Sequence, residues 1–207
     1  MKTARRYFCL AALLPIFFAS CATFPYGGSF PRVVNVCVLN DKADPASEKI
    51  IRKVTTNVFR EYEERIGVRF VAKAFVPFEG NLDVWPIELG PTAKNACPEN
   101  TEVRMIFSNQ LMSVLDENGK EVELGGLSHD YYGVLIVFNF DGRAYRNDAG
   151  GNPALESSLK HEIGHLFGLN HTEDKNSFMY KVSNKSQGQW TDEILKQLLE
   201  KRTKKWY

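Results

Sequence analysis

Apolar and polar residues alternate in three stretches of the chain, and this alternation predicts β-strands. The stretches are residues 33–39, 68–75 and 102–108, which are rich in β-branched and aromatic side chains. Between the first two, residues 46–66 carry apolar side chains close to the helical period, and Gly67 follows. This apolar stripe consists of Ile50, Ile51, Val54, Val58, Phe59, Tyr62 and Ile66. A strand, a helix and a strand in this order predict a right-handed crossover and a parallel strand pair.

Two further strands are predicted in the middle of the chain. A turn signal at Asn118 and Gly119 precedes a short strand candidate at residues 124–128. Residues 133–140 form a continuous apolar run that is typical of a buried strand. The stretch 76–101 is rich in Pro, Gly and Asn, and we interpret it as a loop.

Two helices are predicted toward the C-terminus. The polar residues 141–152 predict a loop, with Asn152 as the N-cap and Pro153 in the first turn of the helix that follows. Thr191 is suited to cap a last helix at residues 192–201, whose apolar positions are Ile194, Leu195, Leu198 and Leu199. Its basic end is Lys201, Arg202, Lys204 and Lys205. We interpret these charges as a solvated terminus that complements the helix dipole, with a nucleic-acid or lipid patch as the alternative.

The first residues have the pattern of a secretory signal. Lys2, Arg5 and Arg6 precede an apolar run at residues 7–19, which is too short for a comfortable membrane span. Phe18-Ala19-Ser20-Cys21 also resembles a bacterial lipobox, in which Cys21 is lipidated and becomes the new N-terminus. An ordinary signal peptidase that cleaves after Ala22 is the competing interpretation.

The remaining chain predicts one exported domain. We expect residues 1–21 to be the signal, residues 22–31 a short tether and residues 32–207 a single domain. The whole chain of 207 residues has a formal charge of +1, and loss of the three basic signal residues leaves −2. No electrostatic attraction to nucleic acid follows from this charge, and we expect a monomer held at a membrane by its lipid, or secreted if cleaved after Ala22.

Candidate chemistry is concentrated in residues 161–171, which read HEIGHLFGLNH. In a helix, His161 and His165 lie on one face and can share a metal ion, while Glu162 lies beside them without being a ligand. Gly168 can adopt positive φ, so the chain can turn back and bring His171 as a third ligand. Three protein ligands and an open fourth position are typical of catalytic zinc, which activates water for Glu162 to deprotonate. The alternative is a solvated helix with a glycine C-cap.

Met179 and Tyr180 follow the third histidine at a spacing that resembles the metzincin zinc peptidases, most closely the matrixin branch. In that family a methionine-containing turn lies beneath the zinc-binding histidines. The resemblance implies that His161, His165 and His171 bind one zinc ion, that Glu162 is the general base and that Met179 forms the turn. Lys181 stands where two other branches have a tyrosine that approaches the metal, so we interpret Tyr180 as a packing residue.

The resemblance also implies a fold and a substrate class. The expected fold is α+β: a metzincin-like zincin fold with a twisted, mixed five-stranded sheet, two long helices, one of which carries HExxH, a Met-turn and a C-terminal helix. The implied activity is that of a zinc metalloendopeptidase whose protein or peptide substrate binds along the short edge strand at residues 124–128. Two alternatives remain, a non-catalytic zinc-binding surface adhesin and a zinc amidase that acts on a cell-wall substrate.

Other metal sites and a disulfide are less strongly indicated. Matrixins hold a second, structural zinc through several histidines, but only His129 lies outside the motif here, and we interpret it as a surface residue. A Ca²⁺ site is conceivable in the loop at Asp141, Asn147, Asp148 and Asn152, although no EF-hand pattern is present. An oxidising exterior would allow Cys37 and Cys97 to pair, whereas Cys37 can equally be a buried strand residue.

Overall fold

The structure is a computed structural model that describes residues 31–41, 45–80, 82, 86–115, 118–139, 153–181 and 188–207. The predicted signal with Cys21, almost all of the tether and the predicted calcium loop at residues 141–152 lie outside the described residues. Among the helices that are described, none is both long and apolar enough to cross a membrane.

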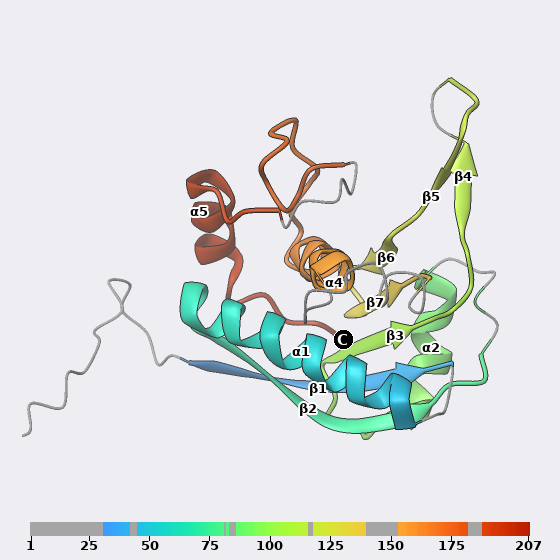
Figure 1. The fold of residues 1–207 in the computed structure, drawn as a ribbon. Coiled ribbons are helices and arrows are strands. Elements are labelled where there is room, and N and C mark those ends of the chain that lie inside the picture. The colour runs from blue at the N-terminus through green and yellow to red at the C-terminus, as the bar shows by residue number, and fades with distance from the viewer. Residues whose placement is uncertain are drawn as a thin grey trace, which may run out of the picture.

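A five-stranded mixed sheet forms the centre of the molecule (Figure 1). Its spatial order is β2-β1-β3-β7-β6. The strands are β1 (Arg32–Asn40), β2 (Val68–Pro77), β3 (Val103–Phe107), β6 (Gly126–His129) and β7 (Val134–Val137). Neighbouring strands are parallel except for β6, which runs antiparallel to β7 at the edge of the sheet. The predicted parallel opening pair and the predicted short edge strand are both confirmed.

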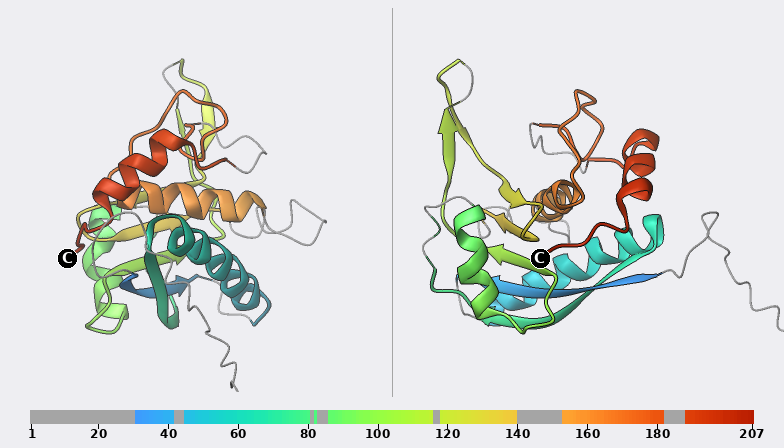
Figure 2. Two further views of the ribbon diagram at one scale, coloured as in Figure 1. Left: turned by 90° about the vertical axis from the view of Figure 1, so that its left-hand side faces the viewer. Right: turned by 180° about the vertical axis from the view of Figure 1, so that it is seen from behind.

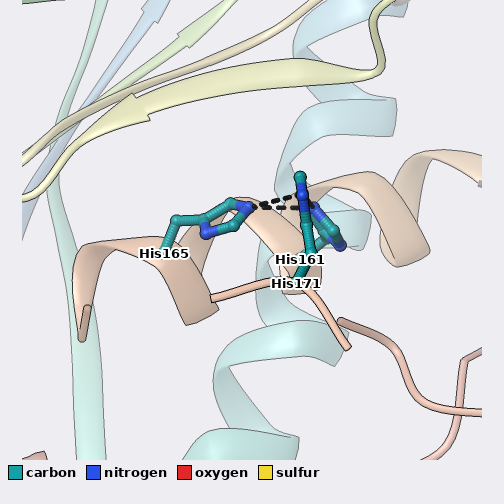
Figure 3. Close-up of side chains that lie close together, drawn as sticks. All are labelled: His161, His165 and His171. Carbon is teal, nitrogen blue, oxygen red and sulfur yellow. Dashed lines mark hydrogen bonds between the residues drawn. The ribbon is translucent and has the colours of Figure 1, made fainter. Parts of the chain in front are cut away.

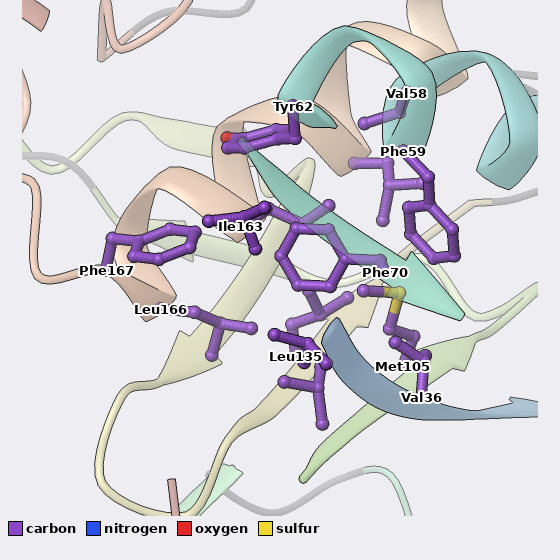
Figure 4. Close-up of a cluster of buried hydrophobic side chains, with 14 of the residues drawn as sticks. Val36, Val58, Phe59, Tyr62, Phe70, Met105, Leu135, Ile163, Leu166 and Phe167 are labelled. Carbon is purple, nitrogen blue, oxygen red and sulfur yellow. The ribbon is translucent and has the colours of Figure 1, made fainter. Parts of the chain in front are cut away.

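Helices cover both faces of the sheet. The long helices α1 (Pro45–Ile66) and α4 (Pro153–Leu166) pack on one face, where Val36, Met105 and Leu135 join Tyr62 and Ile163 in the larger core cluster (Figure 4). Alternate residues of the same strands point to the other face and pack with α2 (Pro86–Ala96). Because the central strands are buried on both sides, most of their residues are apolar.

Helix α2 contradicts the prediction of a loop between β2 and β3. Pro86 starts the helix and Pro91 lies within it, so the residue types that indicate a loop are present in a helical segment. Leu89 and Ala93 are buried in the smaller core cluster, and Cys97 follows the helix and is bonded to Cys37 of β1. Tertiary packing and the disulfide therefore stabilise a helix that local propensity disfavours.

A two-stranded hairpin was also missed by the sequence analysis, which predicted only its turn. Strands β4 (Ser113–Leu115) and β5 (Glu121–Glu123) pair antiparallel, and Gly119 in the connection has a φ of 73°. The hairpin projects away from the sheet beside β6 (Figures 1 and 2). Three-residue strands with exposed side chains give too little alternation for a sequence to reveal them.

The last helix, α5 (Asp192–Lys201), has the predicted N-cap, because the Thr191 hydroxyl accepts a hydrogen bond from the Ile194 amide. Its basic end is not freely solvated, which corrects our expectation. Lys201 Nζ donates to the Gly168 carbonyl at 2.5 Å, and Arg202 is buried. Trp206 Nε1 donates to the Leu166 carbonyl at 3.0 Å. The C-terminal segment thus satisfies carbonyls at the end of the helix that carries the histidines.

Candidate metal centre

Three histidine side chains converge at the C-terminal end of α4 (Figure 3). His161 and His165 lie on successive turns of the helix, and Gly168 ends it with the positive φ, 78°, that the sequence predicts. The chain then turns back and brings His171 to the other two. The Nε2 atoms of His161 and His165 are 3.0 Å apart, and each is 3.1 Å from His171 Nε2.

Backbone carbonyls fix the tautomers of two of these rings. His161 Nδ1 donates to the Phe178 carbonyl at 2.8 Å, and His165 Nδ1 donates to the Leu169 carbonyl at 2.7 Å. A carbonyl oxygen can only accept, so each Nδ1 carries the proton and each Nε2 presents a lone pair. Two lone pairs at 3.0 Å repel each other unless a cation lies between them.

The same surroundings keep these imidazoles neutral. Burial above all, together with the neighbouring His165 and His171, lowers the pKa of His161 to about 4 against the opposing effect of the Phe178 carbonyl. Burial also lowers the pKa of His165 and of His171. Neutral imidazole is the form that binds metal ions.

The three nitrogens fit a zinc ion. Ligand nitrogens at roughly 2.05 Å from a tetrahedral zinc are about 3.3 Å apart. The observed separations of 3.0 and 3.1 Å are slightly below this value, so small ring movements suffice. Among the described residues this is the one cluster of three or more potential metal ligands, and a set of three leaves a coordination position for water or substrate.

The side chain of Glu162 projects from α4 toward the edge strand β6. It is 4% exposed and lines the cleft beside the histidines. A Cβ atom at Gly126 of β6 would come within 2.6 Å of Glu162 Cγ and 2.5 Å of the Ile136 carbonyl oxygen. Gly126 therefore provides the room that the carboxylate occupies. The sequence analysis missed this glycine, whose signal is the pair Gly125-Gly126 at the start of the predicted edge strand.

Met179, the methionine of the predicted Met-turn, packs against α4. It is fully buried, and a Cβ at Gly164 of α4 would come within 2.4 Å of its sulfur. The Thr172 amide donates to the Met179 carbonyl at 3.0 Å, so the turn is tied to the segment that carries His171. Gly164 thus allows the methionine to pack directly against the helix backbone.

A polar network behind the site links α1 to α4. Glu61 Oε2 accepts from Lys160 Nζ at 3.0 Å and from Trp190 Nε1 at 2.7 Å. The Trp190 ring lies 4.9 Å from that of Phe178, whose carbonyl holds His161. Sequence reasoning missed Glu61 and Trp190, because they lie far from the motif along the chain and nothing in the local pattern joins them.

The histidines and Glu162 open into a cleft of about 780 Å³. Its wall on the sheet side includes residues of β5 and β6, and the opposite wall comes from the segment after His171, including Tyr180 and Lys181. His129 lies in the sheet-side wall, is partly buried and is not among the clustered ligands.

The structure joins Cys37 and Cys97 by a disulfide, with their Cα atoms 5.9 Å apart. Cys37 is at the same time fully buried in β1, so the two interpretations of this residue are compatible. The bond links the central sheet to the end of α2 and lies on the face of the sheet opposite to the zinc-binding helix.

Comparison with known proteins connects the site to a family. Residues 116–194 match the family model of matrixin, and this segment includes β5, β6, the histidine motif and Met179. No curated protein matches the chain.

Solved structures share the fold across most of the chain. An archaemetzincin from Methanopyrus kandleri has 14% identity and a TM-score of 0.63, with 86% of this chain and 99% of that chain covered. A zinc-dependent peptidase from Methanocorpusculum labreanum has 18% identity and a TM-score of 0.50, with 79% and 99% covered. Metalloproteinase-II from Bacteroides fragilis has 12% identity and a TM-score of 0.52, with 86% and 55% covered.

At these identities the solved structures establish the fold alone. The matrixin match adds the sequence pattern around the three histidines, and the geometry shows that these histidines can hold zinc. Together they show a metzincin-like fold that carries a matrixin-like sequence pattern around three histidines able to hold a metal ion.

Proposed function

We propose that the protein is a zinc metalloendopeptidase in which Glu162 is the general base. The observation that carries this proposal is the position of a buried carboxylate next to three converging imidazoles in an open cleft. A purely structural zinc site needs neither the cleft nor the carboxylate.

His161, His165 and His171 would hold the zinc ion, which when bound lowers the pKa of water and polarises a peptide carbonyl. Glu162 takes a proton from the attacking water and passes it to the leaving amine. The Phe178 and Leu169 carbonyls keep two of the imidazoles in the ligand tautomer during this cycle.

An extended polypeptide is the substrate that the sheet-side wall supports best. Strand β6 is the last strand of the five-stranded sheet and lines the cleft. A substrate chain can add to such an edge through main-chain hydrogen bonds, with pockets that select alternate side chains. We place the opposite wall of the specificity pocket between Thr172 and Gln189, a range in which residues 182–187 lie outside the described residues.

Export and lipid anchoring belong to the same proposal. The N-terminal pattern favours a lipoprotein attached through Cys21, and cleavage after Ala22 would instead release the protein. The Cys37–Cys97 disulfide is consistent with an oxidising compartment outside the cytoplasm.

Cleavage of a mixed peptide library by the zinc-loaded protein tests this function. Glu162→Ala should lower the cleavage rate by about a hundredfold or more, as expected for loss of a general base. Glu156→Ala is the matched control, since Glu156 lies on the same helix and bonds to Asn57 of α1. Stoichiometric zinc with no cleavage by the native protein would reject peptidase action on this library and favour the surface-adhesin alternative.

Hydrolysis of cell-wall fragments, measured in parallel, separates the peptidase from the amidase. The peptidase cleaves the peptide library and leaves the fragments intact, whereas the amidase shows the opposite preference.

A further inference from the structure

The sheet-side wall of the cleft continues past β6 into the projecting hairpin. Every residue from Val122 to Asp130 lines the cleft, so nine consecutive positions form this wall. Strand β6 accounts for only four of them, and the first two belong to β5. The hairpin is therefore continuous with the candidate substrate site.

The backbone of this wall is supported along its length by two other segments. Gly126 to His129 pair with β7, and Glu121 to Glu123 pair with β4. Between them the Leu124 amide donates to the Met112 carbonyl at 2.8 Å, and the Phe138 amide donates to the Gly125 carbonyl at 3.1 Å. The Asn139 side chain also donates to Glu123 at 2.9 Å and ties the hairpin base to the end of β7.

One face of the hairpin carries an apolar ridge. Val114 and Val122 are direct cross-strand partners and are 36% and 38% exposed. Met112 and Leu124, which precede and follow them by two positions on the same face, are partly buried against the smaller core cluster. The ridge thus extends from the core to the cleft, and Val122 and Leu124 line the cleft directly.

The opposite face of the hairpin differs from the apolar ridge in its exposure and in its contact with the cleft. Leu111 and Leu115 are more exposed, at 71% and 72%, but neither lines the cleft. Leu115 is paired with Glu121 and Ser113 with Glu123, so this face is mixed with acidic side chains. Of this face Glu123 alone lines the cleft, so apolar contact with a ligand there is expected from the valine face.

The spacing along the wall sets the length of such a ligand. Gly126 contacts the Glu162 side chain and so marks the position of the reacting bond. Val122 precedes it by four residues, which corresponds to about 13 Å at roughly 3.3 Å per extended residue. On the other side β6 ends at His129, three residues beyond Gly126.

We propose that the β4–β5 hairpin is a substrate-binding arm, whose Val114 and Val122 contact an apolar side chain about four residues from the cleaved bond. This inference rests on the proposed peptidase function and specifies its substrate class as long, extended polypeptides. A peptide that ends within two or three residues of the bond on the hairpin side cannot reach the valines.

Nested peptides test the arm. The full chain, zinc-loaded, is first given reduced and alkylated β-casein to locate cleaved bonds. Each site is then made as a long peptide with about six residues on both sides, and as two peptides cut to about two residues on one side or the other. The native protein should prefer the long peptide to one truncated form only, and the truncated end identifies the hairpin side.

The double variant Val114→Ser/Val122→Ser should reduce the ratio of kcat/KM for the long over the truncated peptide by about fivefold. The reason is that the peptide loses its apolar contacts with two partly exposed valines. Leu115→Ser, on the opposite face, should leave the ratio at its native value. An unchanged ratio in the double variant, or an equal fall of the ratio with Leu115→Ser, would contradict the proposal that the hairpin is a substrate-binding arm.

Binding of the same peptides to Glu162→Gln, followed by fluorescence anisotropy, separates the arm from catalysis. Tighter binding of the long peptide that disappears on addition of the valine substitutions supports the arm. Where the native protein cleaves nothing, overlapping β-casein peptides of the same lengths replace the nested set, and such binding without cleavage rejects the proposed function alone. A native dimer that the valine substitutions convert to a monomer would show that a second copy occupies the ridge, and would overturn the proposal.

Discussion

Two glycines, Gly164 in α4 and Gly126 in β6, determine how closely neighbouring side chains approach the site. Gly164 gives room to the Met179 sulfur, and Gly126 gives room to the Glu162 side chain. Neither glycine has a positive φ, so each is needed for its missing side chain and not for an unusual backbone conformation. The position of the carboxylate therefore depends on a residue that performs no chemistry itself.

Gly126→Ala should lower kcat/KM by tenfold or so while one zinc ion remains bound. The added Cβ would overlap Glu162 Cγ and the Ile136 carbonyl, so the carboxylate or the edge strand must shift, and displacements on the order of 1 Å are costly in catalysis. Zinc content by mass spectrometry and peptide cleavage are measured on the same sample. Native activity in this variant would show that Glu162 does not need its observed position.

The ligand set could be predicted at this scale because a helix and one glycine turn fix the positions of His161, His165 and His171 locally. Gly126 and Trp190 could not be predicted, because each reaches the site through tertiary packing. The family resemblance singled out Met179, but Gly164 as the residue that makes room for its sulfur required the structure.

Among the elements, those with long periodic patterns were predicted and the short or irregular ones were not. Helix α1 and strands β1, β2 and β3 match their predicted positions, since each buries a regular stripe or alternation of side chains. Helix α2 contains Pro91 and Gly90, and the hairpin strands have three residues each. Helix α2 is stabilised by tertiary contacts, and the hairpin is stabilised mainly by the pairing of β4 with β5.

The contact between α1 and α4 gives a stability prediction. Glu61→Ala leaves the nearly buried Lys160 ammonium and the Trp190 indole N–H without their shared acceptor, and should lower the free energy of unfolding by about 2 kcal/mol. Urea denaturation of the full chain measures the change. Glu173→Ala, which removes an exposed ion pair with Lys181, should cost well under 1 kcal/mol and is the control. Equal losses in the two variants would contradict the structural role of Glu61.

Across the whole molecule, segments far apart in sequence converge on the helix that carries the histidines. The C-terminal segment binds the carbonyls of Leu166 and Gly168, and α1 binds the helix through Glu61 and Tyr62. On the other face of the sheet the Cys37–Cys97 disulfide fixes α2. In the described part of the chain, both faces of the sheet are therefore covered.

Removal of the disulfide should destabilise this domain without removing its metal site. A bond that closes a separation of 60 residues contributes about 4 kcal/mol in the chain-entropy treatment. Cys97→Ser should therefore lower the unfolding midpoint in urea markedly, while zinc is still bound at low denaturant. An unchanged midpoint, or identical midpoints for the native protein with and without reductant, would contradict the bond.

Zinc titration of the metal-stripped full chain, with β-casein cleavage recorded at each addition, decides whether the site acts as proposed. Cleavage should be absent without metal, rise with added zinc and stop rising at one equivalent, because three histidines form one site. Glu162→Gln should bind zinc with the same stoichiometry, and its cleavage rate should be lower by about a hundredfold or more. Cleavage that persists without zinc, or equal cleavage by Glu162→Gln, would contradict a zinc peptidase that uses Glu162 as its base.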